Sequence, residues 1–178
     1  MLGALKLAII SEGVNSWPFY VAQSKSLFAR EGIEADITLT GSSARQLDAE
    51  GFMSLGSTAE YFPTYPGPIA AARRSWAREH GHELLSFIRA MRAAHGWLTD
   101  RRNRNEAVQV LCARLDTDPV QAAAAFDAFA ERPQPQITAA GLRQVIETVW
   151  EAEGFRRPRR APENYMDLSY LARAEKFG

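Results

Sequence analysis

Cysteine is almost absent from the chain, since Cys112 is the only one among 178 residues. A lone cysteine excludes a disulfide within the chain and any metal cage built from several thiolates. Val108 and Leu115 lie at helical spacing from Cys112, so we predict a small core residue rather than a reactive thiol.

An excess of charge of one sign is also lacking, because 21 basic residues are balanced by 21 acidic ones. No overall field therefore draws the chain toward nucleic acid or anionic lipid. The run RRPRR, Arg156 to Arg160, resembles a nucleic-acid patch, but it is short and stands in a chain without net positive charge. We interpret it as a solvated connector and expect no nucleic-acid partner.

Long apolar runs are missing as well, and none approaches the roughly 20 residues that a membrane-spanning helix needs. The opening residues, MLGALKLAII, have a strand-like composition and lack the cleavage region of a secretory signal. We therefore expect no membrane span and no signal peptide, which predicts a cytoplasmic location if the chain is the native product.

The most informative stretch that is present runs from Asn15 to Asp36, NSWPFYVAQSKSLFAREGIEAD. It lies between two apolar runs, Ala4–Ile10 and Ile33–Leu39, that are typical of strands. A helix is predicted from about Pro18 to Arg30, with Gly32 as its left-handed stop. This order predicts a β-α-β unit, in which the loops after both strands meet at one edge of a parallel sheet. Small ligands bind at that edge in α/β folds.

The rest of the first third continues this pattern. Ser43 and Gln46 form a capping-box pattern that predicts a helix start, and Phe52–Gly56 is a predicted third strand. Helix is expected to dominate the remainder of the chain, beginning with a segment from about Ile69 to Glu79. We predict a β/α part over about residues 1–56 and a helical part over about residues 68–178.

The helical part carries capping signals and apolar stripes. Asn103 and Glu106 are predicted to cap one helix, and Asp118 followed by Pro119 predicts the start of the next. The predicted buried faces are Leu84, Ile88, Met91, His95 and Leu98; Ala122, Phe126 and Phe129; and, in a helix over Thr138–Glu153, Leu142, Val145, Ile146, Val149 and Trp150.

A candidate anion site lies in the turn after the second predicted strand. Gly41, Ser42 and Ser43 would offer free backbone N–H groups, two hydroxyls and the positive end of a helix dipole. A sulfonate, carboxylate or phosphate would suit such a turn. The alternative is that Ser43 merely caps the helix, as serine commonly does.

Three residues near the loop after the first strand could complete that site. Asn15 offers an amide, and Trp17 and Tyr20 could form an aromatic wall against a flat or apolar ligand. The alternative is packing, with the Trp17–Phe19 segment covering the start of the helix. Both interpretations are compatible with the sequence.

The three histidines give little support to a metal site or to catalysis. His80 and His82 flank Gly81 and are predicted to be exposed linker residues, while His95 is predicted to lie in the core. No carboxylate or cysteine accompanies them at ligand spacing, and no catalytic triad or nucleophile elbow is present. We therefore expect no metal, no cofactor and no enzymatic activity.

Three phrases of the chain form a recognisable set. Their residues are Pro18, Tyr20, Val21, Ala22, Gln23, Leu27, Phe28, Glu31, Gly32 and Ile33; then Gly41, Ser42, Ser43, Ala44, Gln46, Leu47 and Ala49; and then Phe87, Ala90, Ala94, Trp97, Leu98, Asp100, Asn103, Arg104, Glu106, Ala107 and Val108. In these phrases the chain resembles the periplasmic substrate-binding proteins of bacterial ABC importers. The most similar branch binds sulfonates, taurine, nitrate or thiamine-pyrimidine precursors. The family has Gly where this chain has Ser26, a departure expected to cost little.

This resemblance implies a particular architecture. Family members clamp a ligand between two lobes, but here Asp48–Glu50 leads directly into GFMSLG (Gly51–Gly56), which resembles the strand returning from the second lobe. The resemblance therefore implies that the second lobe is absent between about residues 48 and 52. The implied fold is a single α/β lobe over residues 1–178, with a small, mainly parallel sheet flanked by helices and a helix-rich C-terminal half.

The resemblance also implies a function: non-enzymatic binding of a small anionic or pyrimidine-like solute, in the periplasm and beside an ABC permease. The alternative is a structural or interaction module, a truncated lobe that no longer binds ligand. Such a lobe would form a homodimer through the face left by the missing second lobe.

Overall fold

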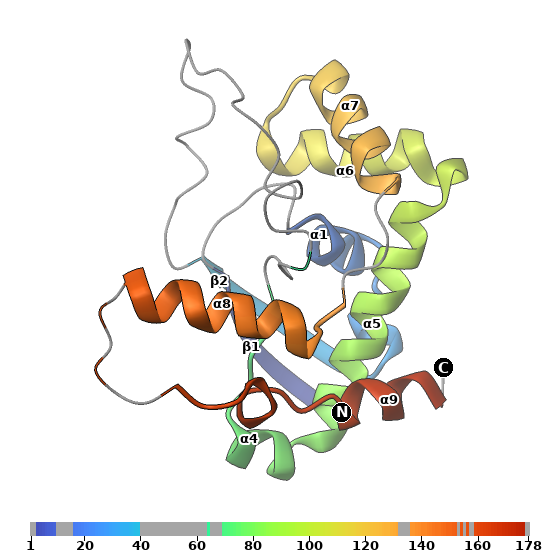
Figure 1. The fold of residues 1–178 in the computed structure, drawn as a ribbon. Coiled ribbons are helices and arrows are strands. Elements are labelled where there is room, and N and C mark those ends of the chain that lie inside the picture. Colours follow the sequence, from blue (N-terminus) through green and yellow to red (C-terminus); the bar gives the residue numbers. More distant parts are fainter. Residues whose placement is uncertain are drawn as a thin grey trace. The chain divides into compact units, whose positions relative to one another are not determined.

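The computed structural model describes residues 3–9, 16–39, 64, 69–131, 136–152, 154, 156 and 159–176. They form a mixed α/β structure, with a small parallel sheet flanked by helices and a helix-rich remainder, which confirms the predicted fold class (Figure 1). Two compact units contain these residues. Unit 1 comprises residues 1–49, 72–133 and 170–178, and unit 2 comprises residues 50–71 and 134–169. The single lobe over residues 1–178 stays a prediction, and its junction near residues 48–52 lies outside the described residues.

The N-terminal β-α-β unit is present in unit 1 as predicted. Strand β1 (Gly3–Ile9) pairs in parallel with β2 (Ile33–Leu39) along its whole length. Leu5 and Ile33 are buried on the core side of this pair, while Lys6 and Glu34 are exposed. The alternation is that expected of a sheet with one covered face.

The helix between the two strands is not continuous, and the prediction of one helix over Pro18–Arg30 is wrong in this respect. It consists of α1 (Trp17–Ser24) and α2 (Leu27–Arg30), interrupted at Ser26, whose φ of 54° is left-handed. Gly32, with φ of 75°, ends the second piece as predicted. Serine is a poor residue for a left-handed position, so the conformation of Ser26 costs free energy.

Ser26→Gly should therefore stabilise the protein by about 0.5–1 kcal/mol, since glycine adopts the left-handed conformation without a Cβ penalty. Urea denaturation compared with the wild-type protein measures the change. Ser24→Gly, at the last residue of α1, is the matched control and should not stabilise the protein, because Ser24 is not in the left-handed conformation. Equal effects of the two substitutions would contradict the assignment of Ser26.

Two helices follow in unit 1. Helix α4 (Arg74–Glu79) begins five residues after the predicted start at Ile69, because Arg73 is extended and Ile69 is exposed. In helix α5 (Gly81–Thr99), Leu98 is buried as predicted, and the other buried residues are Ser86, Phe87, Ala90 and Ala94. The larger residues predicted to be core, Leu84, Ile88, Met91 and His95, are only half-buried.

Small residues explain this difference. Ala90 and Ala94 are fully buried on α5, and α5 packs against α1 more extensively than against any other helix of unit 1. A side chain of one carbon lets the two helix backbones approach closely. Of the larger side chains of the predicted stripe, Ile88 and Met91 are partly buried against the core.

Helices α6 (Arg104–Leu115) and α7 (Pro119–Ala130) complete the core of unit 1. The carboxylate of Asp118 accepts hydrogen bonds from the backbone N–H groups of Val120 and Gln121, which confirms the predicted N-cap. Ala122 and Phe126 are buried as predicted, whereas Phe129 is half-buried. Asn103 stands at the N-cap position of α6 but its side chain does not cap the helix, contrary to the prediction.

Unit 2 contains α8 (Ala139–Ala152), whose predicted bounds were 138–153, and the short 3-10 helix η4 (Pro162–Asn164) packed against it. Leu142 and Ile146 are buried, but Val149 is 40% exposed, so the buried face of α8 is narrower than predicted. Helix α9 (Ser169–Lys176) returns to unit 1, where the Tyr170 hydroxyl donates a hydrogen bond to the Ala77 carbonyl at 2.7 Å. Within the described ranges, no helix is long and apolar enough to cross a membrane.

Candidate functional site

The carboxyl ends of β1 and β2 lie side by side. Ile9 and Leu39, the last residues of the two strands, are register partners in the parallel pair. Residues 10–15 and 40–43 therefore continue the chain from the same edge of the sheet, which is the edge where α/β folds bind ligands. Asn15, Gly41, Ser42 and Ser43 lie outside the described residues, and their ligand contacts stay predictions.

Trp17 is a core residue. Its side chain is fully buried at the start of α1, with its ring 5.9 Å from that of Phe126 in an edge-on arrangement and 5.8 Å from that of Phe129. These contacts join α1 to α7. The indole Nε1 is buried and has no hydrogen-bond partner among the described residues.

Tyr20 is also buried, on the next turn of α1. The Arg114 guanidinium lies over its ring, with Cζ 5.3 Å from the ring centroid, and also donates a hydrogen bond to Gln23. Trp17 and Tyr20 therefore both pack against side chains of neighbouring helices, as the packing interpretation of these residues predicted. A ligand contact by either ring stays a prediction.

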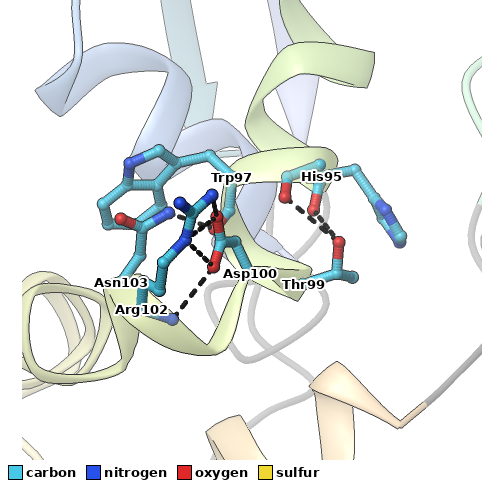
Figure 2. A network of polar contacts seen from close by, with 7 residues as sticks. His95, Trp97, Thr99, Asp100, Arg102 and Asn103 are labelled. Atoms are coloured by element: carbon cyan, nitrogen blue, oxygen red, sulfur yellow. Dashed lines mark hydrogen bonds and ion pairs between the residues drawn. The ribbon is translucent and has the colours of Figure 1, made fainter.

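The turn between α5 and α6 holds a network of polar contacts (Figure 2). The Arg102 side chain folds back onto Asp100, with its Nη2 2.6 Å from the carboxylate, and the Asn103 amide donates to the Trp97 carbonyl at 2.9 Å. The hydrogen bonds from Arg102 hold the pKa of Asp100 below its ordinary range. These bonds fix the corner between two helices.

Two further ion pairs anchor α6. The Lys25 ammonium pairs with Glu106 and lies 4.7 Å from the ring centroid of Trp97, linking the end of α1 to α5 and α6. Arg104 binds Asp127 of α7 with two parallel hydrogen bonds, of 3.0 and 2.8 Å, which lower the pKa of that carboxyl.

The residues of the third phrase therefore take part in contacts within and between the helices of unit 1. The apolar members of the phrase are buried or half-buried in α5 and α6, and its polar members take part in the helix corner and in the ion pairs that join neighbouring helices. Nothing in the described contacts assigns these residues to a ligand. The phrase specifies how the helices pack around the β-α-β unit.

The histidines differ partly from expectation. His80, at the boundary between α4 and α5, is not a free linker residue, because its ring stacks on Trp76 with centroids 4.9 Å apart and lies 3.8 Å from Glu83. His82 is exposed, as predicted. His95 is half-buried rather than a full core residue, and its ring lies 5.4 Å from that of Phe129. Across the described segments, no group of histidine, cysteine and acidic residues could hold a metal ion.

The burial of His95 predicts a pH-dependent stability. Desolvation lowers the pKa of His95 below its ordinary value of 6.5. Between the lowered pKa and 6.5 the unfolded chain binds more protons than the folded one, so the free energy of unfolding rises with pH in that window. The contribution is fully present above pH 6.5 and is lost as the pH falls through the pKa of the folded state.

Urea unfolding from pH 5 to pH 8 should therefore show a smaller pH dependence for His95→Gln than for the wild-type protein. His82→Gln is the matched control, since it removes an exposed imidazole from the same helix. An equal loss of pH dependence in both variants would contradict the assignment to His95.

A hollow lies beside α8 in unit 2. It was not predicted from the sequence. Its volume is about 250 Å³, and its lining consists of Arg143, Ile146, Glu147, Arg159, Arg160, Ala161 and Pro162. The run RRPRR, predicted to be only a solvated connector, contributes two of these arginines. Local sequence gave no sign that the run would meet Arg143, because that meeting depends on how η4 packs against α8.

No family model, no curated protein and no solved structure matches the chain. The kinship with importer binding proteins therefore rests on the sequence phrases and stays a prediction.

Proposed function

We propose that this chain is a non-enzymatic solute-binding lobe of the importer type, which binds a small anionic or pyrimidine-like molecule at the carboxyl edge of β1 and β2. The observation that carries the proposal is the register pairing of Ile9 with Leu39. Because of this pairing, both predicted ligand segments, residues 10–15 and 40–43, begin at one edge of the sheet. In the importer setting, such a lobe would act in the periplasm and deliver its solute to a membrane permease.

The start of α1 supports an anion at this edge. The segment that leaves β1 leads into the first turn of α1, where backbone N–H groups have no partner within the helix. The positive end of the helix dipole adds to the attraction for a negative group. Asn15 and the hydroxyls of Ser42 and Ser43 would supply the remaining polar contacts.

A second candidate is a self-associating module that binds no solute. It is favoured by the burial of Trp17 and Tyr20, because an aromatic wall closed within the core leaves the edge with less apolar contact for a ligand. A single lobe also encloses less of a ligand than two lobes do.

Thermal-shift measurements against sulfonates, carboxylates, phosphate and pyrimidines separate the two candidates. A bound solute should stabilise the fold, by about 2.7 kcal/mol at a hundredfold excess over Kd. Asn15→Ala and Ser42→Ala should remove the shift. Ser24→Ala is the matched control, since Ser24 is an exposed serine and the last residue of α1.

The outcomes are distinct. A shift that disappears in Ser42→Ala and persists in Ser24→Ala supports the solute-binding lobe. No shift with any compound, together with a dimer by light scattering, supports the self-associating module. A shift that survives both Asn15→Ala and Ser42→Ala contradicts the proposed site.

A further inference from the structure

The hollow in unit 2 is formed by one face of α8 and by residues 159–162, which lead into η4. Ile146 and Pro162 are buried and supply apolar surface to its lining. Because η4 packs against α8, the two sides of the hollow belong to one packed arrangement within unit 2. The hollow is therefore a built feature of this unit.

Positive charge is concentrated around the hollow. Its lining has three guanidinium groups, of Arg143, Arg159 and Arg160, and one carboxylate, of Glu147. The chain as a whole has equal numbers of basic and acidic residues, so this is a local excess and not a consequence of composition.

The three arginines differ in how their charge is balanced. Arg159 is 3.4 Å from the carboxylate of Glu151, which lies outside the lining. Within the part of the chain that the structure describes, neither Arg143 nor Arg160 forms an ion pair. The positive charges around the hollow outnumber the single carboxylate of its lining, and an anion between the guanidinium groups would relieve their mutual repulsion.

We propose that the hollow binds the phosphate group of a small molecule, either a phosphate monoester or inorganic phosphate. Guanidinium groups bind phosphate oxygens through parallel N–H···O bonds, and a phosphate dianion can accept from several arginines at once. Ile146 and Pro162 add buried apolar surface beside these groups, and a less polar surrounding strengthens charge-assisted bonds. This site is separate from the solute site proposed above and does not depend on it.

The size of the hollow favours a small ligand. Its volume of about 250 Å³ is below the range of about 300–1,000 Å³ that is usual for sites of drug-sized molecules. A phosphate with a short substituent suits this volume. A nucleic-acid backbone would instead need a row of basic residues along an extended surface.

Isothermal titration calorimetry with inorganic phosphate, and separately with methyl phosphate, tests the proposal at constant ionic strength set with sodium chloride. Saturable binding with one site per chain is expected for at least one of the two probes. Tighter binding of methyl phosphate would identify a monoester as the ligand, and tighter binding of inorganic phosphate would identify the free ion.

Arg143→Gln and Arg160→Gln should each weaken binding of the preferred probe at least tenfold. Glu147→Gln should strengthen it several-fold, because the variant removes the one carboxylate of the lining. Arg156→Gln is the matched control: it removes the same charge from the same basic run, but Arg156 does not line the hollow. Binding by this control should stay within twofold of the wild-type protein.

Four results would overturn the proposal. The first is the absence of saturable binding with both probes. The second is equal weakening in Arg156→Gln and Arg160→Gln, which would indicate general attraction to a basic run. The third is loss of binding in Ser42→Ala while Arg143→Gln and Arg160→Gln bind normally, which would assign phosphate to the edge of β1 and β2. The fourth is displacement of phosphate by an oligonucleotide whose binding is weakened as much by Arg156→Gln as by Arg160→Gln. That result would indicate a nucleic-acid surface.

Discussion

Replacing Trp17 with alanine should lower the free energy of unfolding by about 3–5 kcal/mol, the usual cost of removing a fully buried large aromatic side chain. The indole is completely buried and its ring contacts Phe126 and Phe129, so the substitution would leave a cavity between α1 and α7. Urea denaturation followed by far-UV circular dichroism measures the loss.

Trp97→Ala provides the matched control for this prediction. Trp97 is also a tryptophan of unit 1, but it is half-buried and its ring faces the Lys25 ammonium. Its removal should cost clearly less. If the cost of Trp17→Ala were below about 1 kcal/mol, the burial of Trp17 would be contradicted and the predicted aromatic wall would regain support.

Trp17→Phe separates packing from the polar group of the indole. The buried Nε1 has no partner among the described residues, and a buried donor without a partner costs about 1–3 kcal/mol. Phenylalanine keeps much of the ring contact and removes that donor. The variant should therefore be much closer to the wild-type protein than Trp17→Ala in stability. If the two variants were equally unstable, Nε1 would have an essential partner in the folded protein.

The parts of the fold that could be predicted are those specified by local signals. Two apolar runs separated by a helix predicted the parallel pairing of β1 and β2. The left-handed Gly32 and the N-cap Asp118 were predicted from neighbouring residues alone, and both are confirmed. Each of these features depends on backbone geometry within a few residues, so it leaves a clear pattern in the sequence.

The parts that could not be predicted depend on tertiary packing. The interruption at Ser26 places a serine in a conformation that its own propensity disfavours, so it must be imposed by the packing of α1 and α2 on α5. Likewise, the buried face of α5 includes the small residues Ala90 and Ala94, while the larger Leu84 and Met91 are only half-buried. The spacing of large apolar residues along the sequence does not predict the burial of such small residues.

The candidate site likewise has features that local patterns predicted and features that depend on tertiary packing. Local patterns predicted where the two strand ends meet, which is confirmed by the pairing of Ile9 with Leu39. They could not decide between ligand contact and packing for Trp17, since a tryptophan at a helix start serves either purpose. They also gave no sign of the arginine-lined hollow, whose members come from separate segments of unit 2.

Two leucines of α5 provide a direct test of which stripe forms the core. Leu98→Ala should destabilise the protein by about 2–5 kcal/mol, because Leu98 is fully buried and its truncation leaves a cavity in unit 1. Leu84→Ala makes the same chemical change on the same helix, but Leu84 is only half-buried. Its cost should be less than half that of Leu98→Ala, as measured by urea denaturation of both variants.

The comparison is informative because the sequence predicted both leucines to lie on the buried stripe, whereas the structure assigns only Leu98 to the core. Both substitutions replace leucine with alanine inside a helix, so the change in helix propensity is nearly the same and cancels in the difference. What remains is the difference in burial and in cavity volume. Equal costs for the two variants would restore Leu84 to the buried stripe and contradict its half-buried position.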